Sequence, residues 1–177
     1  LKRIRPDALY RNVPHPIYEN FGRAIPKAEA RTALGLSAEK VMLFFGYIRP
    51  YKGLFVLLEA MHLLAQSGMK NLVLLVVGEC YGDEEAYRAK IGELGLASSV
   101  KFVSDYVPND KVAIYFSAAD AVVLPYLSAT QSGIVQIAYH FDKPVIAPAT
   151  GGLPEVVLDG KPGFIVPPNS PSALAGA

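Results

Sequence analysis

Four short apolar runs constrain the fold of this chain more than any other feature of its sequence. They cover residues 41–46, 72–78, 121–124 and 144–147, and none of them alternates apolar with polar residues. Runs of this kind predict strands that are buried on both faces, as in a parallel sheet covered by helices on two sides. Residues 100–103 and 163–166 are shorter and weaker strand candidates.

Helical patterns fill the intervals between these runs. Residues 54–66 place Glu59, His62 and Gln66 on one polar face, and 84–94 and 112–119 each carry an apolar stripe at helical spacing. A short helix is expected from Pro26 to residue 34, with Gly35 ending it, and another at 131–141.

Strand–helix–strand units of this kind predict an α/β fold. The sheet is expected to be doubly wound and mostly parallel, with helices on both faces. Residues 26–177 would form one domain, and residues 1–25 would be a lead-in or interdomain segment, because prolines and a glycine interrupt them.

Composition narrows the function classes. The chain has 177 residues, 51% hydrophobic and 19% charged, and its net charge of +1 gives no electrostatic signature for nucleic acid. Its one cysteine excludes an internal disulfide and fits a reducing compartment. No apolar run approaches the roughly 20 residues of a membrane span, and no secretion signal is present. We therefore expect a cytoplasmic protein, and the missing initiator Met suggests a piece of a longer one.

The chemistry is expected at the carboxyl ends of the strands, where open α/β sheets bind ligands. That rule gathers the loops at 47–53, 78–82, 104–108, 125–133 and 148–155, which hold few candidate acids, bases or nucleophiles. They do hold two cations, Arg49 and Lys52, whose alternative interpretation is a solvated loop. Because helix N-termini bind anions, the polar residues leading into the 131–141 helix predict a phosphate or carboxylate ligand there.

Two expectations concern the start of that helix. Ser128 or Thr130 is expected to cap it, and Gly133 to let a ligand approach the backbone of its first turn. Two cations and a helix N-terminus together could neutralise a departing diphosphate without a metal.

Metal and dinucleotide sites are poorly supported. The sequence has no Asp-x-Asp and no cysteine cluster, and His15, His62 and His140 share no ligand spacing. Residues 83–85, all acidic, are better explained as the solvated start of a helix. The Gly-x-Gly-x-x-Gly signature is absent, and Cys80 is most simply an inert thiol.

Five motifs, in order, resemble the C-terminal, donor-binding domain of retaining GT-B glycosyltransferases of family 4 (group 1). Gly-x-x-Arg-x-x-Lys-Gly at 46–53 is similar to the family's diphosphate loop, and 119–125 to the strand before its donor loop. Residues 143–147, 151–155 and 163–167 resemble the next strand, a glycine turn and the closing strand. The likeness runs from about residue 12 to about residue 174.

The resemblance implies that the chain is the Rossmann-like half of a GT-B fold, without its N-terminal acceptor domain. It implies retaining, metal-independent transfer from a nucleoside-diphosphate sugar, with no cofactor, to a glycan or lipid-linked acceptor in polysaccharide or glycolipid biosynthesis. Peripheral membrane association stays open if the acceptor is a lipid. Residues 103–108 would lie near the base. Arg49 and Lys52 would stabilise the leaving diphosphate, and the donor-binding residues would be Gly46, Gly53, Thr130, Gln131, Ser132, Gly133, Gly152 and Glu155.

One departure separates this chain from the pattern. The family usually has two Glu eight residues apart here, and the matching positions are Ala129 and Ile137. Residues 130–133 would have to supply substitutes, and Gln131 can hydrogen-bond hydroxyls without a charge. The nucleotide base, the sugar and the acceptor are not predicted. Two alternatives remain open: an epimerase of the same fold, and a non-catalytic nucleotide- or sugar-binding module.

Overall fold

A computed structural model describes residue 9 and residues 20–157, 159–160 and 162–177 of the chain. Most of the predicted interdomain segment at 1–25, with His15, lies outside the described residues. The expected short helix is present as α1 (Lys27–Ala33), and Gly35 follows it with a φ of 63°.

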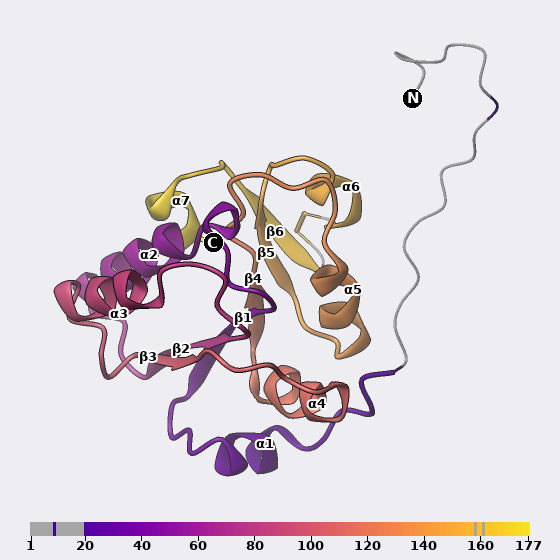
Figure 1. The fold of residues 1–177 in the computed structure, drawn as a ribbon, viewed down its shortest axis with the longest axis horizontal. Helices are drawn as coiled ribbons and strands as arrows, with labels where there is room; N and C mark the ends of the chain where they lie inside the picture. Colours follow the sequence, from indigo (N-terminus) through magenta and orange to yellow (C-terminus); the bar gives the residue numbers. More distant parts are fainter. Residues whose placement is uncertain (1–8, 10–19, 158, 161) are drawn as a thin grey trace.

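Six parallel strands form one sheet in the order β3-β2-β1-β4-β5-β6 (Figure 1). This is the order of doubly wound nucleotide-binding sheets, with the topological switch between β1 and β4. All six predicted strands are present, and the two weaker candidates are its edge strands. The bounds are β1 (Lys40–Phe45), β2 (Leu72–Val77), β3 (Val100–Val103), β4 (Ala121–Val123), β5 (Val145–Pro148) and β6 (Gly163–Val166).

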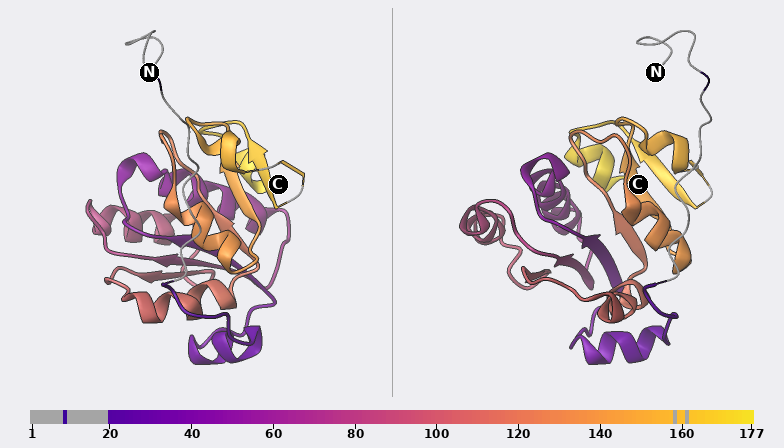
Figure 2. Two further views of the ribbon diagram at one scale, coloured as in Figure 1. Left: turned by 90° about the vertical axis from the view of Figure 1, so that its right-hand side faces the viewer. Right: turned by 45° about the vertical axis from the view of Figure 1, so that its right-hand side comes forward.

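Helices cover both faces of the sheet (Figures 1 and 2). One face carries α4, α5 and α6, with α1 packed against α4, and the other carries α2, α3 and α7. The bounds are α2 (Leu54–Gln66), α3 (Glu84–Glu93), α4 (Asn109–Ala118), α5 (Gly133–His140), α6 (Leu153–Val156), α7 (Pro171–Ala175) and a short 3-10 helix, η1 (Pro50–Lys52).

Strand β1 shows why the predicted runs lack alternation. Leu43 and Phe45 point into the core under α4 and α5, whereas Phe44 points into the core under α2 and α3. Each face of the strand is therefore buried, and a polar residue on either side would lose its hydration. The prediction of a doubly wound parallel sheet with helices on both faces is confirmed.

Asp120 connects neighbouring elements at the amino end of the sheet, opposite the end at which ligands are expected to bind. Its carboxylate accepts hydrogen bonds from Lys27 Nζ (2.8 Å), Arg31 Nη2 (2.6 Å) and the Val41 N–H (2.7 Å). The contacts tie α1 and β1 to the start of β4. Burial by itself would raise the pKa of Asp120, but these hydrogen bonds and the two positive charges lower it overall.

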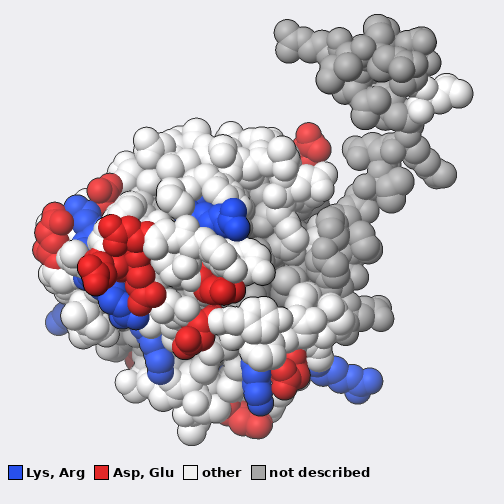
Figure 3. All heavy atoms as spheres, viewed as in Figure 1, with Lys and Arg blue, Asp and Glu red and all other residues white. Residues whose placement is uncertain are grey.

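Charged groups of both signs intermingle on the surface. On the face drawn in Figure 3, one group of charged side chains lies over α3 and another lies at the lower edge, near α1 and α4. Within the described part of the chain, no helix has the length and apolar character to cross a membrane.

His140, at the end of α5, is partly exposed. Its Nε2 lies 2.9 Å from the Gly22 carbonyl oxygen, so the end of α5 is joined to the segment before α1.

Candidate functional site

The loops that follow β1 and β4 meet at the topological switch point. The Leu127 N–H donates to the Tyr51 carbonyl (2.8 Å), which joins the two loops directly. Gly53 has a φ of 70°, and a Cβ there would collide with the carbonyl oxygen of Pro125. A residue other than glycine would push the loops apart, so Gly53 sets their separation.

The glycine turn after β5 supports the loop after β4 from behind. Gly151 has a φ of 54°, and its Cα faces the Ala129 carbonyl so closely that a Cβ would overlap it. The next N–H, from Gly152, donates to the Thr130 carbonyl (3.1 Å). The turn therefore fixes the backbone of residues 129–130.

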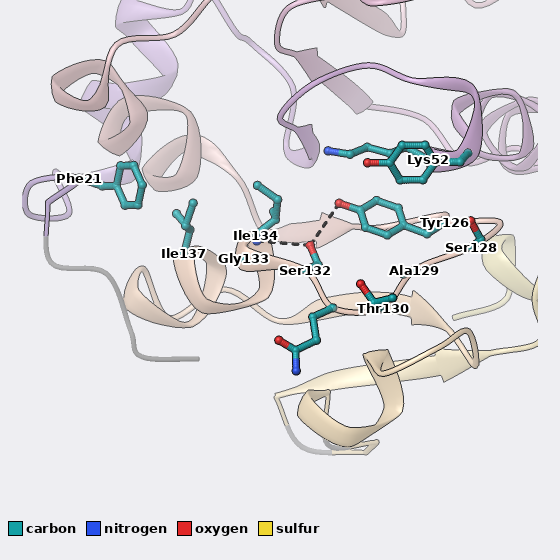
Figure 4. Close-up of a pocket in the computed structure, with 12 residues that line it drawn as sticks. Phe21, Lys52, Tyr126, Ser128, Ala129, Thr130, Ser132, Gly133, Ile134 and Ile137 are labelled. Carbon is teal, nitrogen blue, oxygen red and sulfur yellow. Dashed lines mark hydrogen bonds between the residues drawn. The ribbon is translucent and has the colours of Figure 1, made fainter. Parts of the chain in front are cut away.

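These loops surround a cavity of about 760 Å³ (Figure 4). In the figure, Lys52 and Ser132 flank Tyr126, and Phe21 and Ile137 lie at the far end from Ser128. The lining residues are Phe21, Tyr51, Lys52, Tyr126, Ser128, Ala129, Thr130, Gln131, Ser132, Gly133, Ile134 and Ile137.

Lys52 is a buried cation. Only 8% of its surface is exposed, and no carboxylate of the described residues lies within ion-pairing distance of its ammonium group. Its Nζ is held near the Cα of Gly46, where a Cβ would come within 3.2 Å. Burial, with a further contribution from the charge of Arg49, lowers the pKa of Lys52 to about 8. An unpaired buried cation is costly, which makes it a strong site for an anion.

Helix α5 begins at Gly133 and directs its N-terminus into the same cavity. The capping residue is Ser132, whose Oγ accepts from the Ile134 N–H (3.3 Å), so the prediction of Ser128 or Thr130 as the cap is wrong. The cap must stand directly before the first helical residue, and the helix starts at Gly133, later than the start of the predicted 131–141 span. Among the described residues, the Gly133 N–H has no acceptor, so it is available to a ligand.

Tyr126 is the cavity residue that sequence reasoning missed. It is 3% exposed, and its hydroxyl lies 3.2 Å from Ser132 Oγ. The ammonium of Lys52 lies 5.4 Å from the centre of its ring. Burial raises the pKa of Tyr126 to about 12, although the Ser132 hydrogen bond acts in the opposite direction. Its position three residues after β4, at the carboxyl edge of the sheet, was the signal available in the sequence.

A second cavity, of about 210 Å³, adjoins the first. Lys52 and Ile134 line both cavities, which makes them neighbours around one site. Loops after β1, β2 and β3 supply the rest, as the carboxyl-end rule predicts. The lining residues are Phe45, Gly46, Tyr47, Lys52, Gly78, Glu79, Tyr106, Val107 and Ile134.

Four predicted site residues lie beside the cavities, outside the lining. Gly53, Gly152 and Glu155 line neither cavity, and the first two shape the loops that do. Arg49 is exposed, and its guanidinium lies 5.1 Å from the ring centre of Tyr81 and 5.9 Å from that of Tyr47. The donor contacts assigned to these residues stay predictions.

The positions of the missing Glu pair are part of the site. Ala129 and Ile137 both line the larger cavity, where no acidic residue of the described chain is found. The described residues also contain no group of three or more His, Cys, Asp or Glu arranged to hold a metal ion.

Comparisons with known proteins agree with this geometry. A family model described as "Glycosyl transferases group 1" matches residues 39–177. D-inositol 3-phosphate glycosyltransferase from Corynebacterium glutamicum (strain R) is 33% identical over 153 residues, which is 84% of this chain and 36% of that protein. This chain thus spans about a third of the length of such relatives.

Solved structures share the architecture. Sucrose-phosphate synthase from Thermosynechococcus elongatus superposes with a TM-score of 0.81 at 29% identity, covering 94% of this chain and 42% of that one. HepE from Anabaena, solved in complex with UDP, gives 0.77 at 26% identity, covering 92% and 44%. The family model covers more than half of the chain, and the fold of the solved relatives agrees with it. The chain therefore belongs to the group 1 glycosyl transferases.

Proposed function

We propose that this chain is the donor-binding domain of a glycosyltransferase and holds a nucleoside-diphosphate sugar at the switch point of its sheet. The observation that carries the proposal is the convergence of buried Lys52 and the N-terminus of α5 on one cavity. The relationship to HepE, which was solved with UDP, supports a nucleotide ligand.

The diphosphate is assigned to the space between Lys52 and the first turn of α5. There the ammonium group, the Gly133 N–H and the helix dipole would each act on the same negative charge. Two unit charges about 4 Å apart attract by about 4 kcal/mol in surroundings of intermediate dielectric, before desolvation is subtracted. Because this attraction grows as the bond to the sugar breaks, it would stabilise the leaving group.

The sugar is assigned to the neutral polar part of the larger cavity, formed by Ser128, Thr130 and Gln131. These side chains donate and accept hydrogen bonds, and they suit hydroxyl groups without adding a charge. The base would occupy the smaller cavity, beside Tyr106 and Val107. We also propose retention of anomeric configuration, transfer without a metal or cofactor, and a cytoplasmic reaction. The acceptor, a glycan or a lipid-linked glycan, would contact the part of the protein beyond this chain.

Direct binding tests the assignment. The intact protein is titrated calorimetrically with UDP, GDP and ADP, with and without Mg²⁺. At least one nucleoside diphosphate is expected to bind, and chelation of metal should leave its affinity unchanged. Failure of all three to bind would reject the proposed function.

Substitution of the two cations tests the site. Lys52→Ala in the intact enzyme is expected to lower turnover roughly 10²- to 10³-fold, as loss of a preorganised electrostatic stabiliser does. Arg49→Ala should cost less, because its side chain is exposed and lies outside the cavity lining. Lys70→Ala, an exposed lysine in the turn before β2, is the matched control. Normal turnover in Lys52→Ala would show that the diphosphate binds elsewhere.

Product analysis separates transfer from the alternatives. A glycosyltransferase requires an acceptor, whereas an epimerase converts the donor alone. A binding module would hold the donor without turnover. We include this alternative because Ala129 and Ile137 line the cavity at the two positions where the family usually has Glu. The intact protein is incubated with donor, with and without a glycan or lipid-linked acceptor, and the products are resolved.

A further inference from the structure

We propose that Tyr126 is a positioning residue that orients the Ser132 hydroxyl toward the donor diphosphate and so sets the affinity for nucleoside diphosphates. The proposal rests on the proposed function, because it concerns the same cavity. It adds a residue to which neither the sequence motifs nor the family match assigns a role.

Tyr126 joins the two halves of the site. Its ring lies beside the ammonium of Lys52, on the loop after β1, and its hydroxyl reaches Ser132, the capping residue of α5 (Figure 4). No other side chain of the described residues is shown to contact both groups. The ring is locked in place, because only 3% of the residue is exposed.

The hydrogen bonds at Ser132 restrict where its proton can point. A serine hydroxyl has one proton to donate and two lone pairs to accept with. One lone pair accepts from the Ile134 N–H (3.3 Å). If the phenol of Tyr126 fills the other, at 3.2 Å, one tetrahedral direction is left for the serine proton, and we assign it to the cavity that Ser132 lines. An anion there then receives a hydrogen bond from Ser132 and another from the Gly133 N–H.

The phenol is suited to be the donor of this pair. Burial raises the pKa of Tyr126 to about 12, so the phenol keeps its proton throughout the physiological range. A phenol is also more acidic than an aliphatic alcohol, and the more acidic partner donates. Only 3% of Tyr126 is exposed, so its phenol has little contact with water that could compete for this bond.

The test is Tyr126→Phe in the intact protein, with affinity measured by calorimetry for the tightest-binding of UDP, GDP and ADP. The change keeps the ring beside Lys52 and removes only the hydroxyl. The dissociation constant is expected to rise roughly 3- to 10-fold, the effect of one lost hydrogen bond. Ser132→Ala should raise it by a similar or larger factor, and Ser132→Thr, which keeps a hydroxyl, should restore most of the affinity.

The double variant shows whether the two hydroxyls act as one unit. Tyr126→Phe together with Ser132→Ala is expected to bind no more weakly than Ser132→Ala alone, because the tyrosine acts through the serine. Tyr139→Phe is the matched control: it removes another phenol, this one on α5, which donates to the Val156 carbonyl (3.4 Å) and does not line the cavity. Its affinity should equal that of the wild type.

Three results would overturn the proposal. The first is unchanged affinity in Tyr126→Phe, and the second is an equal loss in Tyr139→Phe, which would indicate a general effect on folding. The third is a double variant whose losses multiply, which would make the residues independent. A wild-type protein that binds none of the diphosphates would remove the proposed function itself, whereas these results leave that function standing.

Discussion

Lys52 is the residue on which the proposed chemistry most depends, and its environment makes it sensitive to pH. A lysine in water keeps its proton to a pH near 10.5, whereas burial and the nearby charge of Arg49 bring the pKa of Lys52 to about 8. The folded chain therefore holds this ammonium group close to the point at which it loses its charge. A bound diphosphate would favour the charged form and raise the pKa again.

We predict that affinity for the diphosphate falls as the pH rises through 8. Above that value the free protein has lost the proton that the bound state requires, so the dissociation constant should rise by up to about tenfold per pH unit. Calorimetry between pH 7 and 9.5 measures the effect. Lys52→Arg supplies the control, because a guanidinium keeps its charge in this range and its affinity should vary little. A flat profile in the wild type would contradict the assigned role of Lys52.

At the level of secondary-structure elements, the loops after β1 and β4 pack closely together and line the cavity. Gly53 stands against the Pro125 carbonyl, and Gly151 against the Ala129 carbonyl. Both glycines also have positive φ, so a side chain at either position would bring backbone strain as well as a steric clash. The elements at the amino end of the sheet are held differently, by the carboxylate of Asp120.

We predict that Gly53→Ala destabilises the chain by roughly 2 to 5 kcal/mol, the sum of backbone strain and a steric clash. Gly68→Ala is the matched control: its φ is 85°, but nothing lies within 4 Å of the added methyl group. That control measures strain alone, for which about 1 kcal/mol is expected. Chemical denaturation of both variants gives the comparison. Equal losses would mean that the loops can separate without cost.

We also predict that Asp120→Asn lowers the free energy of unfolding by roughly 1 to 2 kcal/mol at neutral pH, a value reduced for partial solvent screening. The pKa of this aspartate is lowered on folding, so its stabilising effect is present above pH 3.8 and is lost as the pH falls through the lowered value. Denaturation of wild type and variant from pH 7 to 3 should show the difference shrinking toward the acid end.

The exposed Asp110 serves as the comparison for that series. Its carboxylate lies 3.9 Å from Lys111, with most of both side chains in solvent. Asp110→Asn should change stability by less than about 0.5 kcal/mol. A difference between wild type and Asp120→Asn that persists unchanged at pH 3 would show that charge is not the cause.

The whole molecule is a doubly wound sheet with two cores, one under each layer of helices. The 153 matched residues make up 36% of D-inositol 3-phosphate glycosyltransferase, so that relative is more than twice as long as this chain. The cavity lies at the carboxyl edge of the sheet, and its walls come mainly from the loops after β1 and β4 and from α5. Under the proposed function, the acceptor would contact a part of the intact protein outside these 177 residues.

We therefore predict that the isolated 177-residue chain binds a nucleoside diphosphate and transfers no sugar. Binding requires Lys52 and α5, which are present, whereas transfer requires a bound acceptor. The measurement is calorimetry on the isolated chain beside a transfer assay on isolated and intact forms with the same donor and acceptor. Transfer by the isolated chain would show that an acceptor site lies within these residues.

The sequence by itself determined the layers of the fold and the edge of the sheet that carries the site. Unbroken apolar runs such as 72–78 can be buried only between two layers, and strands of one direction bring their following loops together. These features are local, so periodicity and residue type reveal them.

The tertiary structure alone decided which side chains face the cavity. Lys52 and Arg49 are three residues apart and equivalent by type, yet Lys52 is buried with no counter-ion among the described residues, and Arg49 is exposed beside two tyrosines. Tyr126 gained its place through contact with Ser132 and Lys52, which come from different loops. Burial and hydrogen-bond partners depend on how separate segments pack together, so the sequence pattern of a single loop does not predict them.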